Sequence, residues 1–304
     1  MDIKNTKNCG FLMIVAAFFW GTTFVAQRNA AAYIGPFTWV CIRALVAVAM
    51  LYPLLILLRR LGVSKKSADP KKAWKAGFVC GIVLLFCTTS QQAGMEFTTA
   101  GKAGFITSLY IVLVPIMRLI GGKRVSGRIW ICVLVALFGL YLLSVKEGFT
   151  VGIGDTLVFI CAIFFSLHIL AVDKYSEEVD AVELCLMQFL ISGVIAIVPM
   201  VIFEHPAPAS IVPAIGPILY AALFSSCVAY TCQIIAQRYV EPSRASLMMC
   251  LESVFALLSG WAVLGEQLTL REGIGCALMF LAIIGSTVLS HGKEGAKIAC
   301  AKEV

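Results

Sequence analysis

Ten apolar stretches, each about as long as a bilayer-spanning helix, constrain this chain more than any other feature. A helix needs roughly 20 mostly apolar residues to cross the hydrocarbon core. Stretches bounded by charged residues, Gly or Pro predict spans at 10–27, 36–58, 74–95, 102–120, 128–145, 154–173, 181–203, 213–237, 243–264 and 271–290. Only 13% of the 304 residues are charged, against about 25% in soluble proteins. The sequence therefore predicts an all-α integral membrane protein and excludes a sizeable soluble domain.

The net charge of +7 is distributed unevenly over the two predicted membrane faces. With the N-terminus in the cytoplasm, 19 of the 24 Lys and Arg residues fall on the cytoplasmic side and 4 on the other, with Arg43 inside a span. Cytoplasmic loops are enriched in Lys and Arg, so both termini are expected in the cytoplasm. The basic stretch at 59–75 is interpreted as a loop beside anionic lipid. No nucleic-acid partner is expected.

The two halves of the chain are weakly similar in sequence and strongly similar in hydropathy. Three shifts align them: 142 residues places Gln91 on Gln233 and Lys102–Tyr110 on Arg244–Glu252, 145 places Arg43 on Gln188, and 146 places Ala16–Trp20 on Ala162–Ser166. We expect two five-helix units, at 1–147 and 148–304, the second with a short cytoplasmic tail. Because five is odd, the second unit enters the membrane upside down. Such inverted-topology repeats recur in secondary transporters.

Four segments carry a resemblance to a known family. They are Trp20–Ala26 (WGTTFVA), Arg43 within CIRALVA, Ala100–Pro115 (AGKAGFITSLYIVLVP) and Pro242–Thr269. Together they resemble the EamA-type members of the drug/metabolite transporter superfamily, over nearly the whole chain. The resemblance implies a basket of ten helices around a central cavity, peripheral fifth and tenth helices, and export of amino acids or other small metabolites. Two residues depart from the family pattern: Ser253 replaces a usual Pro, and Ser166 replaces a frequent Trp.

Three ionisable residues are predicted at membrane depth, namely Arg43, His168 and Glu252. Each such group costs about 2.5–3.5 kcal/mol on insertion scales unless it finds a partner or water. Arg43 and Glu252 are either a buried ion pair or groups that contact a substrate, and Glu252 is a candidate for proton coupling. His168 is either a neutral hydrogen-bonded side chain or a pH-sensitive one, since imidazole titrates near neutrality.

Polar residues recur at helical spacing on three spans. The stripes contain Trp20, Thr23 and Gln27 on the first span, Thr88, Gln91, Gln92 and Glu96 on the third, and Ser226, Tyr230, Gln233 and Gln237 on the eighth. A polar stripe within a span faces either a neighbouring helix or a water-filled cavity, and three stripes favour a shared cavity. Gln91 and Gln233 are the predicted substrate contacts, with Trp20 and Tyr110 as aromatic walls. Pro53 and Pro115 predict local kinks.

Enzyme motifs lack the residues that they need. Gly152–Asp155 matches the GxGD pattern of intramembrane aspartyl proteases, but no second Asp lies in an earlier span, so Asp155 is interpreted as an acid at a helix N-terminus. GxSxG, HExxH and a P-loop are absent from the sequence, and the 12 Cys residues form no CxxC pair. The sequence therefore predicts no enzyme, no metal site, no cofactor and no ATP-driven transport within this chain.

The predicted function is a secondary active transporter in the bacterial cytoplasmic membrane. It is expected to export small polar metabolites such as amino acids by alternating access around a central cavity, with proton coupling left open. The alternatives are a facilitative exchanger or importer and, less favoured, a channel or receptor. A channel would show rings of like charge or a carbonyl filter, and the sequence shows neither. The expected partners are a small-molecule substrate and the lipid bilayer, with protons as a candidate coupling ion.

Overall fold

The computed structural model describes residues 6–64, 67, 69–144, 151–264 and 269–288. Within these ranges every regular element is helical. Eight helices are long and apolar enough to cross a membrane, namely Cys9–Ala31, Pro36–Arg60, Pro70–Met95, Ala100–Ile120, Ile153–Tyr175, Ala181–Glu204, Pro208–Gln237 and Pro242–Ala262. They correspond to predicted spans one to four and six to nine, so the helical membrane class is confirmed. The basic residues Lys4, Lys65, Lys66 and Lys146, the predicted boundary at 147/148 and the tail beyond 288 lie outside the described residues.

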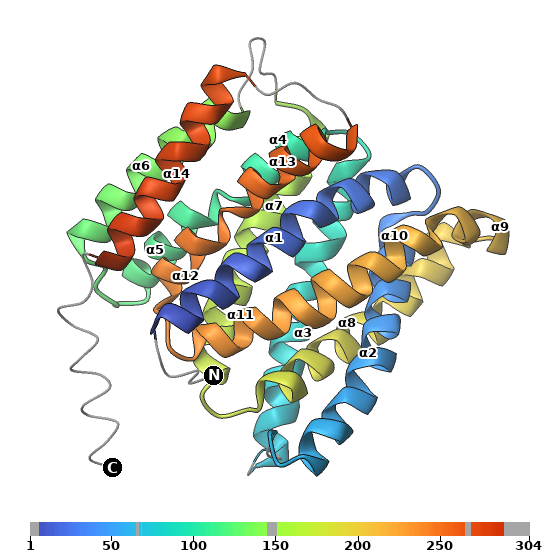
Figure 1. Ribbon diagram of the computed structural model, residues 1–304. Helices are drawn as coiled ribbons and strands as arrows, with labels where there is room; N and C mark the ends of the chain where they lie inside the picture. Colours follow the sequence, from blue (N-terminus) through green and yellow to red (C-terminus); the bar gives the residue numbers. More distant parts are fainter. Residues whose placement is uncertain (1–5, 65–66, 68, 145–150, 265–268, 289–304) are drawn as a thin grey trace.

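Within the described residues the chain forms fourteen α-helical segments, two π-helices and one 3₁₀-helix, most of which are labelled in Figure 1. In order they are α1 (Thr6–Ala31), α2 (Pro36–Arg60), α3 (Pro70–Met95), α4 (Ala100–Thr107), α5 (Tyr110–Ile120), α6 (Gly127–Ser144), α7 (Ile153–Tyr175), α8 (Ala181–Pro199), the π-helix η1 (Met200–Glu204), α9 (Pro208–Ile211), the 3₁₀-helix η2 (Val212–Ala214), α10 (Ile215–Tyr220), the π-helix η3 (Ala221–Ala229), α11 (Tyr230–Gln237), α12 (Pro242–Met249), α13 (Glu252–Leu264) and α14 (Leu270–Val288).

The predicted spans at 102–120 and 243–264 are each broken into two helices. The breaks fall at Ser108–Leu109, between α4 and α5, and at Cys250–Leu251, between α12 and α13. At both breaks the backbone tightens, because the second residue donates to the carbonyl three residues earlier, at 3.2 Å and 3.4 Å respectively. The predicted prolines do not mark these breaks: α2 continues through Pro53, and Pro115 lies inside α5. The two breaks lie 142 residues apart, which is the shift that aligns these segments in the sequence.

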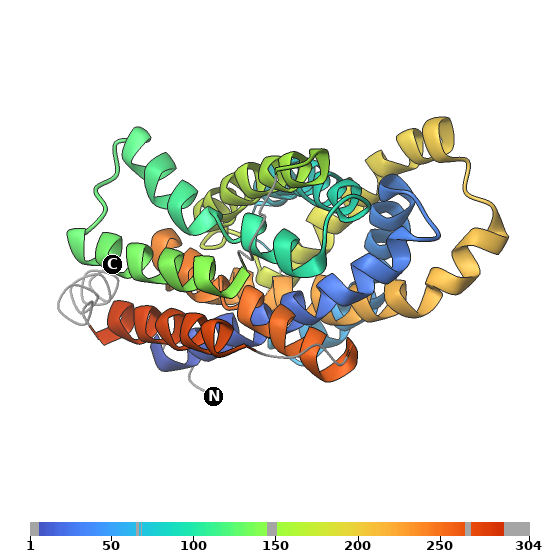
Figure 2. The ribbon, with the colours of Figure 1, turned by 90° about the horizontal axis from the view of Figure 1, so that it is seen from above.

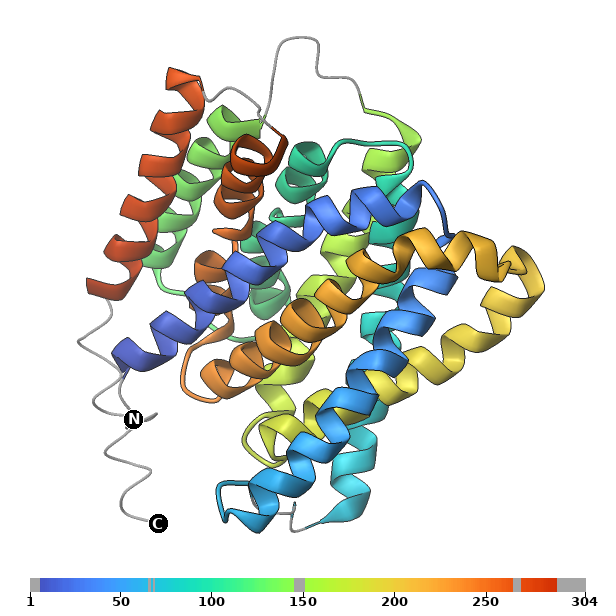
Figure 3. The ribbon, with the colours of Figure 1, turned by 45° about the vertical axis from the view of Figure 1, so that its right-hand side comes forward.

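The helices pack in pairs that recur with the two halves of the chain exchanged. α3 packs against α7, and α1 correspondingly packs against η3 and α11, along which it runs in Figure 3. Likewise α1 packs against α13, and α7 against α4 and α5. The pairs α2–α8 and α6–α14 each join equivalent helices, and they lie at opposite edges of the bundle (Figures 1 and 2).

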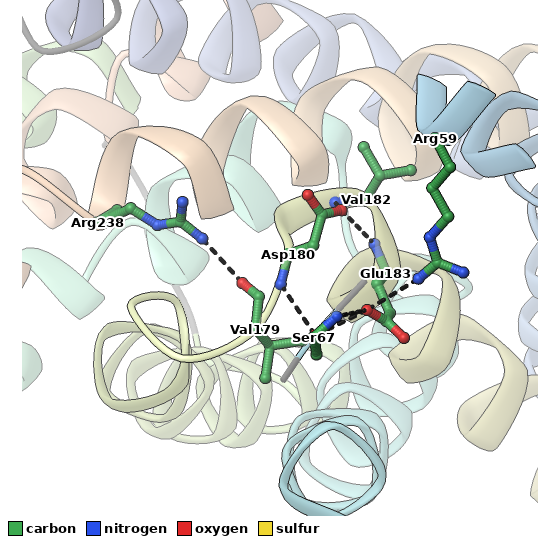
Figure 4. A network of polar contacts seen from close by, with 7 residues as sticks. All are labelled: Arg59, Ser67, Val179, Asp180, Val182, Glu183 and Arg238. Carbon is green, nitrogen blue, oxygen red and sulfur yellow. Dashed lines mark hydrogen bonds and ion pairs between the residues drawn. The ribbon is translucent and has the colours of Figure 1, made fainter. Parts of the chain in front are cut away.

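The carboxylates of Glu183, near the start of α8, and of Glu204, at the end of η1, bind the two ends of α2. Glu204 accepts hydrogen bonds from the backbone N–H groups of Phe37 (2.8 Å) and Thr38 (2.7 Å) at the start of α2, and from the Thr38 hydroxyl (2.6 Å). At the other end, Glu183 pairs with Arg59 at 3.0 Å and accepts from the Ser67 hydroxyl at 2.7 Å (Figure 4). α2 and α8 are therefore antiparallel. We call the two faces of the bundle the Glu204 end and the Glu183 end.

Candidate functional site

A small cavity of about 30 Å³ lies between helices in the middle of the bundle. In this conformation it has room for about two water molecules. Its walls come from α1, α2, α3, α4, α7, η3, α11 and α13, and thus from both halves of the chain. The lining residues are Trp20, Thr23, Phe24, Gln27, Arg43, Cys87, Thr88, Gln91, Thr107, Phe165, Ser225, Tyr230 and Glu252.

A chain of polar side chains joins three helices along one wall of the cavity. The Gln27 amide donates to the Gln91 amide oxygen at 3.0 Å, and the Gln91 amide donates to the Thr107 hydroxyl at 3.2 Å. The chain thus links α1, α3 and α4. Within α1, Gln27 is the lining residue nearest to the Glu204 end, so the polar wall lies toward that end.

Three aromatic side chains close the cavity on the opposite side. The Trp20 ring makes edge-to-face contacts with Phe165 (5.4 Å between ring centroids) and with Tyr230 (5.0 Å). In α1 and in the η3–α11 segment, these aromatic residues are the lining residues nearest to the Glu183 end. We call this layer of Trp20, Phe165 and Tyr230 the aromatic floor. It separates the cavity from the Glu183 end of the bundle.

The cavity contains two oppositely charged side chains that do not pair with each other. Arg43 and Glu252 are both buried, each with 3% of its surface exposed, and both line the cavity. The Arg43 guanidinium lies over the Trp39 ring at 5.7 Å, and a Glu252 carboxylate oxygen accepts from the Ser108 hydroxyl at 3.4 Å. Neither residue forms an ion pair within the described part of the chain. The interpretation of the two as a buried ion pair is therefore wrong in this conformation.

Seven of the predicted site residues line the cavity, and four lie elsewhere. The seven are Trp20, Thr23, Arg43, Thr88, Gln91, Tyr230 and Glu252. Of the others, Gln92 donates to the Gln27 carbonyl at 3.1 Å, and Gln233 donates to the Gln237 amide at 2.7 Å. The His168 Nε2 atom is 2.9 Å from the Gln188 amide oxygen, and the Tyr110 ring packs against Phe165. These four are buried between helices in the present conformation.

Several lining residues were not predicted from the sequence. Gln27 continues the polar stripe of the first span, so the sequence does carry an indication of its role. In the sequence, Phe24 and Phe165 cannot be told apart from aromatic residues that only pack between helices. Thr107 and Ser225 belong to no periodic polar stripe. No group of three or more His, Cys, Asp or Glu residues that could hold a metal ion occurs among the residues the structure describes.

The eight apolar spans found among the described residues make this a multi-pass membrane protein, and the family comparison makes it a transporter. The chain belongs to the EamA-like transporter family, whose profile matches residues 8–145 and 152–288. The predicted family resemblance is thereby confirmed.

Two of the curated relatives are named uncharacterized transporters. An uncharacterized transporter of Archaeoglobus fulgidus is 33% identical over 279 residues, covering 90% of this chain and 83% of that protein. The uncharacterized transporter YoaV of Bacillus subtilis is 21% identical, covering 90% and 95%. A crystal structure of a protein 16% identical superposes with a TM-score of 0.74 over 93% of this chain and 98% of that one. That last likeness concerns the fold alone.

Proposed function

We propose that the protein is a secondary carrier that moves small zwitterions, amino acids first among them, through the cavity by alternating access. The observation that carries the proposal is the presence of Arg43 and Glu252 in one buried cavity without an ion pair between them. A zwitterion offers a carboxylate to the first and an ammonium group to the second. Direction of transport rests on the family resemblance, which favours export.

Burial makes this arrangement selective. A charge in a low-dielectric environment is costly unless it is paired, so two separated opposite charges favour a ligand that brings both partners. The amide of Gln91 adds both a donor and an acceptor for the polar part of the ligand. Trp20 and Tyr230 supply apolar surface for its carbon atoms. A neutral sugar would leave both charges without a counter-charge.

The exchange of helix contacts between the halves supports two inverted five-helix units. Equivalent breaks and a family profile that matches twice support the same arrangement. Most described basic residues lie at the Glu183 end, among them Arg59, Lys72, Arg118 and Arg124, whereas Arg28, Lys102 and Arg271 lie at the other. The positive-inside rule then supports an orientation with the Glu183 end and both termini in the cytoplasm, and with the cavity nearer to the outer face.

Counterflow in proteoliposomes tests the transported class. Vesicles are loaded with one unlabelled compound and diluted into the same compound in labelled form, using alanine, ethylamine and propionate as a set that presents both charges or one of them. We expect saturable, trans-stimulated uptake of the zwitterion alone, and its loss in Arg43→Gln. Equally fast uptake of ethylamine or propionate would reject the zwitterion proposal. Uptake without trans-stimulation would indicate a channel.

Proton coupling is a separable part of the proposal and depends on Glu252. This carboxylate faces the cavity and is bonded to the neutral Ser108 hydroxyl, so it is available to exchange a proton when the cavity opens. With an imposed pH gradient, the parent is expected to accumulate substrate and Glu252→Gln only to equilibrate it. If a pH gradient drives both proteins equally, Glu252 does not couple protons. If it drives neither, the protein is a facilitative exchanger.

A further inference from the structure

The side chains behind the aromatic floor resemble a binding surface that is closed. We propose that Tyr110, His168, Gln188 and Gln233 form a second half-site, which receives the same zwitterion when the bundle opens toward the Glu183 end. The inference rests on the proposed carrier function and adds to it a set of residues on the far side of the floor.

The first argument is the correspondence between the two halves of the chain. The shift of 142 residues relates Gln91 to Gln233 and Glu252 to Tyr110, and the shift of 145 relates Arg43 to Gln188. The structure places these counterparts similarly: Arg43 lies seven residues after the start of α2, and Gln188 seven residues after the start of α8. Because α2 and α8 are antiparallel, the two residues lie toward opposite ends of the bundle.

The second argument is position relative to the aromatic floor. The Tyr110 ring lies 5.2 Å from that of Phe165, and the His168 ring lies 6.0 Å from Phe165 and 5.7 Å from Tyr230. None of the four proposed residues lines the observed cavity. On α7 and α11, His168 and Gln233 lie one turn beyond the floor residues of the same helix, toward the Glu183 end. The proposed half-site and the cavity therefore share the floor as a partition.

The third argument is that three of these side chains leave polar atoms unsatisfied. His168 Nδ1, Gln188 Nε2 and Gln233 Oε1 are buried without a hydrogen-bond partner within the described chain. All three side chains are fully buried. An unpaired buried polar atom is destabilising, and native proteins keep few of them. Water and a polar substrate would satisfy these atoms when the floor opens.

The chemistry of the second half-site differs from that of the cavity. Gln188 takes the place of Arg43, and Tyr110 takes the place of Glu252, so donors and acceptors remain but the fixed charges do not. Of the four, only His168 has an imidazole, whose two ring nitrogens can each donate or accept a hydrogen bond. The zwitterion would be held there by hydrogen bonds to amide, hydroxyl and imidazole groups.

Cysteine accessibility from the two membrane faces tests the proposal with a matched pair. Gln91→Cys and Gln233→Cys are each introduced and treated with a membrane-impermeant maleimide, in right-side-out and in inside-out vesicles, with the labelling of the parent's own cysteines subtracted. We expect each variant to react at least tenfold faster from one face, and the two to prefer opposite faces. Ile234→Cys, at a fully buried neighbour on α11, should react from neither face and so controls for unfolding.

The labelling experiment needs no substrate, so its result tests the second half-site directly. The proposal is overturned if Gln233→Cys reacts from neither face, or from the same face as Gln91→Cys. If Gln233→Cys does not reach the membrane, Gln188→Cys takes its place with the same expectation. Counterflow by the parent protein reports separately on the carrier function, so failure of the half-site and failure of the proposed function give different results.

Discussion

The two broken helices, α4–α5 and α12–α13, are interrupted at equivalent positions of the backbone but carry different side chains there. α4 and α12 each have eight residues and each is followed by a two-residue break. The first residue after the break is Tyr110 in one and Glu252 in the other. The two halves keep the same helix interruption, but the side chain next to it changes from a neutral phenol to a carboxylate. A symmetric scaffold therefore carries an asymmetric site.

The two breaks also contact each other. The Ser253 hydroxyl donates to the Gly104 carbonyl at 2.9 Å and lies 2.7 Å from the Ser108 hydroxyl. The outer anchors of the two helices differ more. α4 is tied to α7 by the ion pair of Lys102 with Asp155 (2.5 Å), whereas α12 is tied to the end of α5 because Arg118 pairs with Glu241. The breaks are thus joined at the centre and anchored separately at the periphery.

The chemical difference between the two interruptions is tested most directly by removing the charge at one of them. Glu252→Gln is expected to slow counterflow of the zwitterion at low concentration by up to about 100-fold, since contacts to charged groups contribute about 1.5–3 kcal/mol. Tyr110→Phe removes a neutral hydroxyl and is expected to slow it by less than about tenfold. Initial rates in proteoliposomes measure both. Equal losses would mean that the two breaks are chemically equivalent.

A second difference concerns how closely the partner helix approaches. A Cβ atom added to Gly21 on α1 would lie 2.5 Å from the Glu252 carbonyl oxygen and 2.8 Å from the Ala256 nitrogen, both backbone atoms of α13. We expect Gly21→Ala to lower the free energy of unfolding by about 2–3 kcal/mol through overpacking. The matched control is Gly101→Ala on α4, where a Cβ atom would meet nothing within 4 Å. Unfolding in mixed detergent micelles measures both, and a similar loss in the control would refute the packing argument.

The anchor of α4 provides a third test. Asp155 is buried and accepts from Thr98 at 2.9 Å and from the Gly152 N–H at 2.7 Å, in addition to its pair with Lys102. Asp155→Asn is expected to lower the free energy of unfolding by about 2 kcal/mol. Glu178→Gln, in the exposed pair with Lys72, should change it by less than about 0.5 kcal/mol. A larger loss at Glu178 would contradict this ranking.

The smallest expected effect is at the contact between the breaks. Ser253→Ala and Ser108→Ala should each lower the free energy of unfolding by about 1 kcal/mol, because each removes one hydroxyl from a buried hydrogen-bonded pair. A double-mutant cycle should give a coupling of about 0.5–1 kcal/mol. Strict additivity of the two substitutions would show that the hydroxyls act independently.

Hydropathy and spacing were sufficient to predict the class, most of the spans and seven residues of the cavity. These properties follow from single helices: length gives the span, and periodicity gives the polar face. Arg43, Gln91 and Glu252 were found in this way because polar groups at membrane depth are costly and therefore conspicuous.

The sequence could not predict features that depend on contacts between helices. The breaks at Ser108–Leu109 and Cys250–Leu251 contain neither Pro nor Gly, so no local rule marks them. The separation of Arg43 from Glu252 depends on how α2 and α13 are placed around the cavity. The packing of Gln233 and His168 behind the aromatic floor likewise depends on how α7, α8 and α11 pack together.

The carboxylates of Glu204 and Glu183 have a consequence for motion within the bundle. Because they hold α2 at both ends, a slip of α2 along α8 by one helical turn, about 5.4 Å, would break the bonds to Thr38 and to Arg59 together. We therefore expect α2 and α8 to behave as one rigid unit. The interrupted helices are joined to each other by the Ser108 and Ser253 hydroxyls at their midpoints and by the Arg118–Glu241 pair toward the Glu183 end, and they are the segments that we expect to tilt relative to α2 and α8.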